Sequence, residues 1–313
     1  MSKLAVIAVG GNSLIKDKRK ISVQEQYAAC LETAQSIVAL IKDGYHVVIT
    51  HGNGPQVGFV LRRCEISKYE LPVIPLDACV SDTQGEIGYL LQKAFANVLK
   101  QEGIKKTVAT IVTQVLVDGN DPAFKNPTKP IGTFLKEADA RLHEKRDGWK
   151  VIEDAGRGYR RVVASPMPID IIEIDAIRTL VNNDIITIAV GGGGIPIVKE
   201  EDGSLKGVEA VIDKDYASGL LARELNADCF IISTAVDKVC LNYGKPDQRE
   251  LDVITVKEAE ELLKQGQFPA GSMLPKIKAL IAFAKETKNT AIITSPKNIF
   301  NAVKNQGGTR IIL

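Results

Sequence analysis

Glycine-rich segments follow three apolar runs of the chain, and each segment has the composition of a site for phosphate oxygens. The runs and the residues after them are Leu4–Val9 with Gly10, Gly11 and Asn12; Val47–Thr50 with His51, Gly52 and Asn53; and Ile185–Val190 with Gly191, Gly192, Gly193 and Gly194. Without a Cβ, the backbone N–H groups of such a turn can approach an anion closely. Short β-branched runs are typical of strands buried in a parallel sheet, and ligands bind where such strands end. We therefore expect one crevice built from all three turns; the alternative is three tight turns that bind nothing.

Three lysines stand in contexts that suit phosphoryl transfer, a reaction that depends on alignment and on positive charge more than on covalent catalysis. Lys214 lies between two aspartates just before a predicted helix, and the adjacent carboxylate of Asp215 could hold its ammonium in position. Lys276 lies at the start of another predicted helix, where an anionic ligand would offset the unfavourable helix dipole. Lys129 lies between Pro127 and Pro130, on a stiff segment. The alternative for each is an ordinary solvated lysine.

Other polar and aromatic residues support weaker hypotheses. His51 could act as a general base, but a structural hydrogen bond is the preferred interpretation. Trp149, the single tryptophan, is expected in the core of a subdomain. Arg157 and Arg160 could bind an anion or solvate their segment, and the sequence leaves both readings open.

Common phosphate-binding fingerprints are missing from the sequence. It contains no Walker loop, and Pro196 follows the glycine run where a dinucleotide fold needs its third small residue. No protein-kinase catalytic loop is present. A nucleotide-dependent enzyme of this sequence must therefore use glycine turns combined with lysines.

The periodicity of the chain predicts two series of strand–helix units separated by an insertion. Capping boxes at Ser22–Glu25 and Thr255–Glu258 mark two helix starts, and a long helix is expected over about 82–101. Further helices are expected near 56–63 and over 175–183, and a single strand over 108–117. From 118 to 168 the alternation stops, and Pro, Gly and charged residues predict a subdomain of short strands. The fold class is therefore α/β: a three-layer αβα sandwich with a mainly parallel central sheet and an inserted, protruding subdomain.

Length and composition limit the possible functions. The 313 residues carry 40 basic and 38 acidic side chains, so the formal charge of +2 gives no reason to expect nucleic acid or an anionic membrane as partner. Five cysteines without a Cys-x-x-Cys pair give no reason to expect a zinc site and fit reduced thiols in a cytosol. Because the first predicted strand begins at Leu4, we expect no signal peptide. No apolar run approaches the ~18 residues of a membrane helix. We expect a cytoplasmic protein.

Seven segments together resemble the carbamate kinases of the amino-acid-kinase superfamily. In chain order they are Ala-Val-Gly-Gly-Asn-Ser-Leu, His-Gly-Asn-Gly-Pro-Gln-Val-Gly, Asn-Pro-Thr-Lys-Pro-Ile-Gly, Glu-Asp-Ala-Gly-Arg-Gly, Gly-Gly-Gly-Gly-Ile-Pro, Gly-Val-Glu-Ala-Val-Ile-Asp-Lys-Asp and Pro-Ala-Gly-Ser-Met-Leu-Pro-Lys. The Pro-Thr-Lys-Pro and Gly-Ser-Met-Leu-Pro-Lys segments are the more specific ones. The resemblance covers essentially the whole chain.

The resemblance implies reversible phosphoryl transfer between ATP and carbamate, giving ADP and carbamoyl phosphate, with Mg²⁺ held through the nucleotide phosphates. Flux toward ATP in arginine fermentation and a homodimer are also implied, and the broad apolar face of the helix over 82–101 would suit the dimer. By motif matching, the catalytic residues would be Lys129, Lys214, Lys276 and Asp215. The carbamate side would be lined by Gly10, Gly11, Asn12, Gly52 and Asn53. The nucleotide side would be lined by Gly191 to Gly194, Asp237, Tyr243 and Met273.

This interpretation divides a single domain, 1–313, into functional parts. Residues 1–117 and 169–184 would form the carbamate-side lobe, 185–313 the nucleotide-binding lobe, and 118–168 a lid that carries Lys129. Two alternatives stay open: a relative that phosphorylates another small carboxylate, and a non-catalytic nucleotide sensor. Retention of the three lysines and of the insertion favours the carbamate kinase interpretation.

Overall fold

The computed structural model describes residues 3–10, 22–154, 156–269 and 271–313. Its centre is an eight-stranded sheet, in which neighbouring strands pair in parallel except β16 with β17. The spatial order is β15 (Val253–Thr255), β17 (Thr309–Ile312), β16 (Thr290–Thr294), β12 (Cys229–Ser233), β1 (Leu4–Val9), β2 (His46–His51), β9 (Ile186–Ile188) and β3 (Val108–Thr110). The parallel strands β16, β12, β1, β2 and β9 therefore end at one edge of the sheet.

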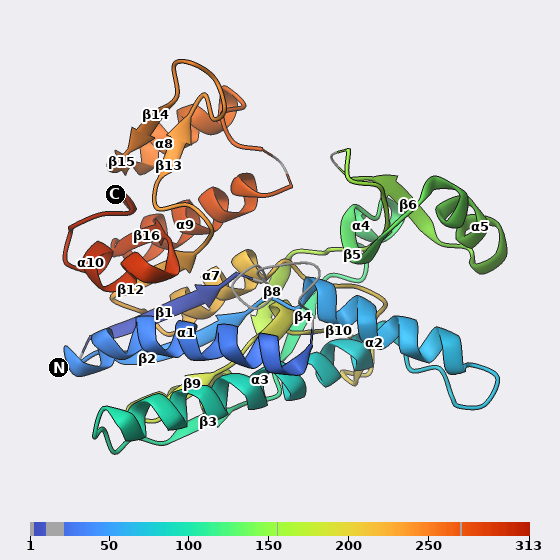
Figure 1. Ribbon diagram of the computed structural model, residues 1–313, viewed down its shortest axis with the longest axis horizontal. Coiled ribbons are helices and arrows are strands. Elements are labelled where there is room, and N and C mark those ends of the chain that lie inside the picture. Colours follow the sequence, from blue (N-terminus) through green and yellow to red (C-terminus); the bar gives the residue numbers. More distant parts are fainter. Residues whose placement is uncertain (1–2, 11–21, 155, 270) are drawn as a thin grey trace.

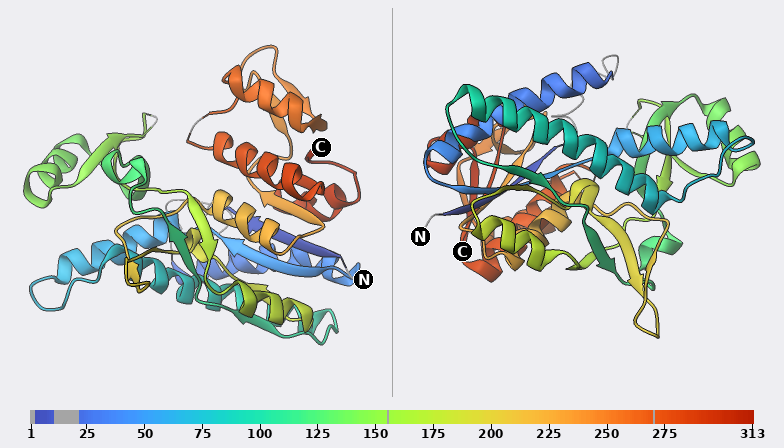
Figure 2. Two further views of the ribbon diagram at one scale, coloured as in Figure 1. Left: turned by 180° about the vertical axis from the view of Figure 1, so that it is seen from behind. Right: turned by 90° about the horizontal axis from the view of Figure 1, so that it is seen from below.

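Helices cover both faces of this sheet (Figures 1 and 2). Along β1, Val6 and Ala8 belong to one apolar core, while Ala5, Ile7 and Val9 belong to the other, as the two-residue period of a strand requires. The first core contains residues of α6 (Ile174–Asn182), α7 (Lys214–Glu224), α8 (Val256–Lys264) and α9 (Met273–Thr287). The second contains residues of α1 (Val23–Lys42), α3 (Leu76–Gln101) and α10 (Ile299–Val303). The predicted three-layer αβα sandwich is confirmed.

The sequence predicts helix starts correctly where it contains a capping box. Both predicted capping boxes are present, at Ser22 and at Thr255. The helix α3 begins at Leu76, earlier than the expected residue 82. Its broad apolar face is buried in the second core against α1 and the sheet, so that face is not available to a partner subunit. The argument that this face suits a dimer is therefore wrong.

The segment 108–117, predicted as one strand, divides between two sheets. β3 ends at Thr110, and β4 (Gln114–Val117) joins a four-stranded sheet. The other strands of that sheet are β8 (Pro168–Ile171), β10 (Ile195–Lys199) and β11 (Leu205–Gly207). The break has a side-chain cause, because the N–H of Thr113 donates to the Oε1 of Gln84 on α3 instead of to a neighbouring strand.

A third sheet forms the subdomain that projects on the right of Figure 1. Its antiparallel strands β5 (Lys129–Leu135), β7 (Tyr159–Val163) and β6 (Lys150–Glu153) are accompanied by α4 (Pro122–Lys125) and α5 (Glu137–Asp147). Short strands were predicted here, but α5 was not. Only Ala140 and His143 of α5 are buried, so its sequence lacks the apolar period that announces a helix.

The subdomain is packed onto α2 (Gly54–Ser67) at its root. Val57 and Leu61 of α2 share a small apolar core with Ile131 and Val163 of the subdomain. A Cβ on Gly58 would lie 2.0 Å from the Cα of Gly132, so the two backbones meet directly. Pro55 lies in the first turn of α2, as predicted.

The C-terminal part carries a separate antiparallel hairpin, β13 (Val239–Leu241) with β14 (Arg249–Leu251). Two short 3₁₀ turns, η2 (Gly191–Gly193) and η3 (Pro296–Asn298), follow β9 and β16. Within the described residues, no helix combines the length and the apolar character needed to span a membrane.

Candidate active site

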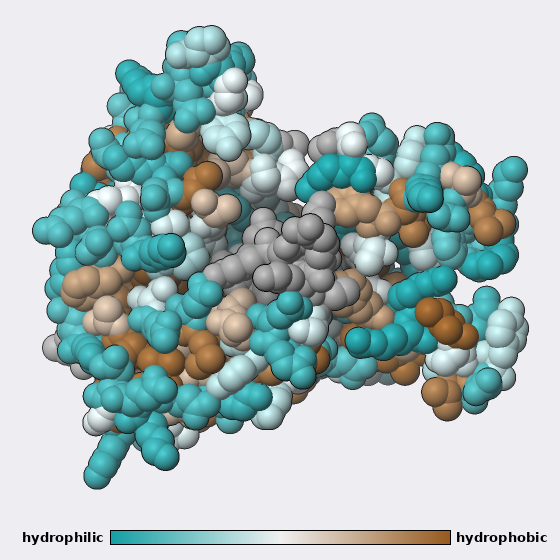
Figure 3. All heavy atoms as spheres, viewed as in Figure 1, coloured by the Kyte–Doolittle hydropathy of each residue, from teal (hydrophilic) through white to brown (hydrophobic). Residues whose placement is uncertain are grey.

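A cleft of about 750 Å³ lies at the edge where β16, β12, β1 and β2 end. Figure 3 shows the surface hollowed between the C-terminal part and the subdomain. Residues just after three of the strands line the cleft: Gly10 and Gly52 after β1 and β2, and Thr234 after β12. Gly192, in the turn after β9, lines the same cleft, so each of the three predicted glycine turns contributes a residue to one crevice.

The three predicted lysines converge on two aspartates at the start of α7. Lys214 and Lys276 donate from Nζ to the two carboxylate oxygens of Asp215, at 2.5 and 2.6 Å. Lys129, which comes from β5 of the subdomain, donates to Asp213. All three lysines line the cleft. Asp213 is also the N-cap of α7, because its other oxygen accepts the N–H of Asp215 at 2.9 Å.

Burial and charge set the ionisation of this cluster. Burial acts to raise the pKa of Asp215, but the ammonium groups of Lys214 and Lys276 outweigh it and hold that pKa well below its usual range. Burial lowers the pKa of Lys214, and the Asp215 carboxylate opposes that shift. Asp215 is therefore an ionised carboxylate that holds two cations at fixed positions.

Lys129 enters the site from the root of the subdomain, not from its tip. It is the first residue of β5, two positions before Ile131 in the small core shared with α2. Arg160 on β7 donates to the carbonyl oxygens of Pro130 and Gly132 at 3.3 and 3.1 Å and pairs with Asp154. Arg160 thus supports the strand that carries Lys129, in addition to lining the cleft.

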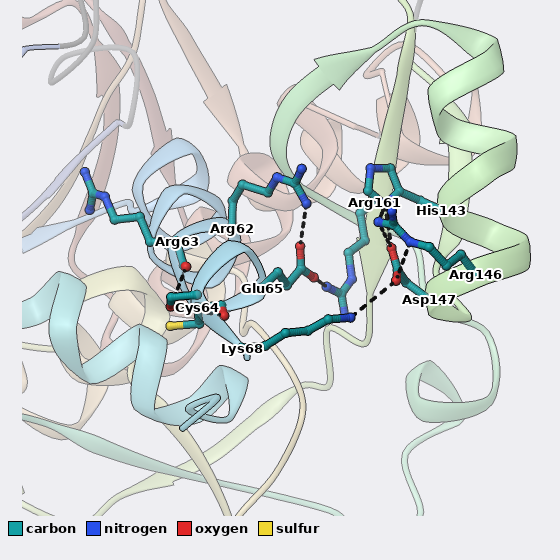
Figure 4. A network of polar contacts seen from close by, with 10 residues as sticks. Arg62, Arg63, Cys64, Glu65, Lys68, His143, Arg146, Asp147 and Arg161 are labelled. Carbon is teal, nitrogen blue, oxygen red and sulfur yellow. Dashed lines mark hydrogen bonds and ion pairs between the residues drawn. The ribbon is translucent and has the colours of Figure 1, made fainter. Parts of the chain in front are cut away.

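The outer part of the subdomain, which comprises α5, β6 and the β7 residues up to Arg161, is joined to α2 through ion pairs (Figure 4). Arg161 of β7 donates to Glu65 at 2.8 Å, and Lys68 lies 4.0 Å from Asp147 of α5. A second cavity of about 720 Å³ separates α2 from this region. Trp149 was expected in the core of the subdomain, but it is only half-buried: it stacks on His143 with ring centroids 4.1 Å apart and lines this cavity.

One end of the cleft is formed by Gly10, Gly52, Asn53 and Gly192. The Nδ2 of Asn53 donates to Thr83 on α3 at 2.8 Å. Gly11 and Asn12, which were predicted for this end, lie outside the described residues.

His51 lies behind this end, fully inside the protein. Burial lowers the pKa of His51 to about 4, so the ring is neutral at pH 7. Its Nδ1 lies 3.3 Å from the carbonyl oxygen of Gly52, which can only accept a hydrogen bond. A Cβ on Gly191 would lie 2.4 Å from the Nε2 of His51, so the ring packs against the glycine turn. These contacts fit the structural hydrogen bond rather than a general base.

The glycine run serves close packing more than the cleft wall. A Cβ on Gly193 would lie 2.4 Å from the carbonyl oxygen of Ile212, and one on Gly194 would lie 2.1 Å from the Val115 side chain. Gly193 and Gly194 also have positive φ angles, 95° and 87°. Among the described residues, Gly192 is the member of the run that lines the cleft, and it does so beside Asn53. The prediction that all four glycines line the nucleotide side is not supported.

The opposite end of the cleft includes Asp237, one of the predicted nucleotide-side residues. Its carboxylate accepts a hydrogen bond from the Ser295 hydroxyl. Met273 packs against the first apolar core, and Tyr243 lies in the turn after β13 with 66% of its surface exposed. Within the described part of the chain, Met273 and Tyr243 are not in the cleft wall.

Several cleft and supporting residues were not predicted. Thr234 and Ser295 line the cleft because β12 and β16 end at the same edge as the glycine-bearing strands. That signal was available in the sequence, since both follow buried apolar runs. The pairing of Asp213 with Lys129 and the contacts of Gln84 join segments far apart in the chain, and no local pattern announces them.

The donor set fits a Mg²⁺ ion held chiefly by nucleotide phosphates. Among the described residues, no group of three or more His, Cys, Asp or Glu side chains could hold a metal by itself. Asp213 and Asp215 already bind lysines, and Asp237 binds Ser295. Mg²⁺ commonly keeps several waters and binds through phosphates with one or two carboxylates.

Comparison with known proteins identifies the family to which the chain belongs. The family model for the amino acid kinase family matches residues 3–295. The chain therefore belongs to the amino acid kinase family. Among curated relatives, it is 52% identical to carbamate kinase 1 of Enterococcus faecium, over 96% of this chain and 95% of the relative. It is 47% identical to the carbamate kinase-like protein YahI of Escherichia coli, over 100% of this chain and 99% of that relative.

A solved structure agrees with these relatives. The carbamate kinase of Giardia lamblia bound to AMP-PNP superposes with a TM-score of 0.92 and 43% identity, over 99% of this chain and 98% of that chain. The resemblance to the carbamate kinases is thereby confirmed along the whole chain.

Proposed function

We propose that this protein is a carbamate kinase, which transfers a phosphoryl group between ATP and carbamate and forms ADP and carbamoyl phosphate. The observation that supports it best is the convergence of Lys129, Lys214 and Lys276 on a carboxylate pair in the cleft. Phosphoryl transfer needs positive charge at fixed places around the moving group, and this cluster supplies it. Full-length similarity to carbamate kinases supports the same activity.

In the proposed mechanism, Lys214 and Lys276 contact the oxygens of the transferring and terminal phosphates. Asp215 orients both ammonium groups, since one of its oxygens binds each of them. A bound Mg²⁺ would neutralise part of the phosphate charge. The carbamate oxygen is already an anionic nucleophile, so the reaction needs no general base; the neutral, enclosed His51 agrees with that.

The small substrate would occupy the end of the cleft at Gly10, Gly52 and Asn53, and the nucleotide the end at Asp237. In our proposal the lobe over 1–117 with 169–184 corresponds to the first end and the lobe over 185–313 to the second, with the exception of Gly192, which lies beside Asn53 at the first end. The segment 118–168 acts as a lid whose outer part moves while its root stays packed on α2. The ion-pair bridges and the cavity between α2 and α5 support this division, because they leave the outer part with less apolar contact than the root. Closure would exclude water from a hydrolytically fragile substrate.

The finer assignments belong to the same proposal. The enzyme would run toward ATP, as at the end of arginine fermentation through the arginine deiminase pathway, in the cytoplasm and as a homodimer. Because the apolar face of α3 is internal, the dimer would have to use another surface.

A coupled assay tests the activity directly. The purified protein is given ADP, Mg²⁺ and carbamoyl phosphate, and ATP formation is followed with hexokinase and a dehydrogenase. Carbamoyl-phosphate-dependent ATP formation is expected. Nucleotide binding without turnover would favour the sensor alternative, and turnover only with another acyl phosphate would favour a kinase of a different carboxylate.

A further inference from the structure

The backbone after β9 is strained at the point where it turns toward the cleft. Val190 is fully buried and β-branched, yet its φ is 52°, in the left-handed region that such residues rarely adopt. Gly192, Gly193 and Gly194 follow with φ values of 68°, 95° and 87°. Strained backbone of this kind persists only where its surroundings fix it. The residues around the turn Val190–Gly194 therefore help to determine the shape of the cleft.

Gln84, near the middle of α3, holds this turn from one side. Its side chain is buried, and its Oε1 accepts the N–H of Thr113 at 2.8 Å. Its Nε2 donates to the carbonyl oxygens of Gly191 at 2.8 Å and of Thr113 at 3.1 Å. One amide group thus joins the turn to the segment between β3 and β4.

Thr113 holds the turn from the other side. Its hydroxyl accepts the N–H of the strained Val190 at 3.0 Å and donates to the carbonyl oxygen of Ile111 at 2.8 Å. Thr113 is fully buried, so loss of either partner would leave polar groups without water. The left-handed Val190 conformation is therefore stabilised by this hydroxyl.

The turn Val190–Gly194 also fixes one wall of the cleft. Gly192 lies so close to Asn53 that a Cβ there would be 2.3 Å from the Asn53 Nδ2. The same Nδ2 donates to Thr83, the neighbour of Gln84 on α3. Both Gly192 and Asn53 line the cleft, while Gln84 and Thr113 lie behind them, outside the described cleft wall.

We propose that Gln84 and Thr113 are positioning residues that set the small-substrate end of the cleft by holding the strained turn Val190–Gly194. This inference rests on the proposed function, because it takes carbamate or carbamoyl phosphate as the occupant of that end. It predicts that disturbing the turn changes recognition of the small substrate and leaves the nucleotide end, near Asp237, as it was.

The test uses variants that remove the hydrogen bonds and keep the volume, Gln84→Met and Thr113→Val. For each, kcat/KM for carbamoyl phosphate should fall roughly 10- to 100-fold, because displacement of a substrate contact by about 1 Å can cost that much. The KM for ADP should stay within about twofold of the wild-type value. Thr113→Ser keeps the hydroxyl and should restore the carbamoyl phosphate KM.

Thr309 offers a matched control at another site. Like Thr113 it is fully buried, its hydroxyl donates to a carbonyl, that of Leu251, and it accepts a backbone N–H, that of Val239, at 2.8 Å. Thr309→Val should lower the melting temperature without changing the KM for carbamoyl phosphate. A general loss of stability would therefore be distinguished from a change in the cleft.

The outcomes separate this inference from the proposed function. Wild-type protein that forms no ATP from carbamoyl phosphate contradicts the function and the inference together. If the wild type is active but Gln84→Met and Thr113→Val retain their kcat/KM for carbamoyl phosphate, or lose ADP affinity equally, the inference alone is contradicted. If Gln84→Met does not yield folded protein, the comparison of Thr113→Val, Thr113→Ser and Thr309→Val decides the question.

Discussion

At the scale of single residues, the cleft depends on one carboxylate shared by two ammonium groups. Asp215 has a side chain that is 4% exposed, against 11% for Lys214 and 16% for Lys276, so the two cations are the parts of the cluster open to a ligand. Phosphate oxygens that enter the cleft would compete with Asp215 for the same N–H groups. The carboxylate therefore keeps the ammonium groups aligned before the substrate arrives, which is the condition for electrostatic preorganisation.

Lys214→Ala should lower kcat by roughly 10²- to 10³-fold, since one preorganised charge-stabilising group is lost. The coupled assay measures this change, and circular dichroism checks that the fold is kept. Lys264→Ala removes a lysine whose side chain is 72% exposed on α8 and serves as the control with unchanged kcat. Wild-type kcat in Lys214→Ala would remove this lysine from the mechanism.

Asp215→Asn should destabilise the fold by roughly 3 kcal/mol or more, because two largely buried cations lose their shared partner. Urea unfolding at pH 7 gives the free energy of unfolding. The double variant Lys214→Met with Asp215→Asn should recover part of that loss, since one uncompensated cation is removed as well. A double variant less stable than Asp215→Asn would show that the ion cluster does not account for the effect.

His51 gives the stability a pH dependence with a defined sign. Its pKa is about 4 in the folded protein and 6.5 as the unperturbed reference, so the unfolded chain binds the proton more readily between these values. The contribution of His51 to the free energy of unfolding is thus fully present above pH 6.5. It is lost as the pH falls toward 4, and the total loss is roughly 3 kcal/mol. Urea unfolding from pH 7 to 4 should show a smaller slope for His51→Gln than for the wild type, and equal slopes would contradict the assignment.

At the scale of elements, the placement of Lys129 depends on how closely α2 approaches β5. A methyl group on Gly58 would overlap the Cα of Gly132, so the helix and the strand would have to separate. Lys129 stands three residues before Gly132 on the same strand and would move with it. The absence of a side chain at Gly58 is therefore linked to the position of Lys129 through backbone geometry alone.

Gly58→Ala should lower both kcat and the melting temperature. The gain in helix propensity is about 1 kcal/mol, and overpacking of this kind typically costs about 1–3 kcal/mol, so the clash prevails. Gly85→Ala on α3 is the matched control, because nothing lies within 4 Å of the added Cβ. That variant should be as stable as the wild type or slightly more so. A Gly58→Ala enzyme with full kcat and an unchanged melting temperature would show that α2 and β5 tolerate separation.

At the scale of the whole molecule, the sandwich should be rigid and the outer subdomain should open more readily. Amides of α5 and β6 should exchange with solvent faster than those of β1 and β12, whose side chains lie in the two main cores. Addition of ADP with carbamoyl phosphate should slow exchange in α5 and β6. Hydrogen exchange followed by mass spectrometry measures both effects, and equally slow exchange in the free enzyme would contradict a mobile lid.

What the sequence could predict depended on whether the cause was local. The capping boxes at Ser22 and Thr255 involve residues three positions apart, and both formed as expected. The sandwich followed from apolar periodicity, and Lys214, Lys276 and Asp215 followed from short motifs near helix starts. The break after β3 did not follow, because its cause is Gln84, 29 residues earlier in the chain. The position of Lys129 at the root of the subdomain likewise depends on packing against α2, which no local pattern specifies.

The three lysines are not equivalent in their origin within the chain. Lys214 and Lys276 stand on helices of the central sandwich, whereas Lys129 stands on a strand of a separate three-stranded sheet that one continuous stretch of sequence encodes. Substitutions or insertions in that stretch can therefore occur without changing the residues that hold the other two charges. In such a molecule, the charge on the three-stranded sheet can change independently of the two charges that the sandwich holds.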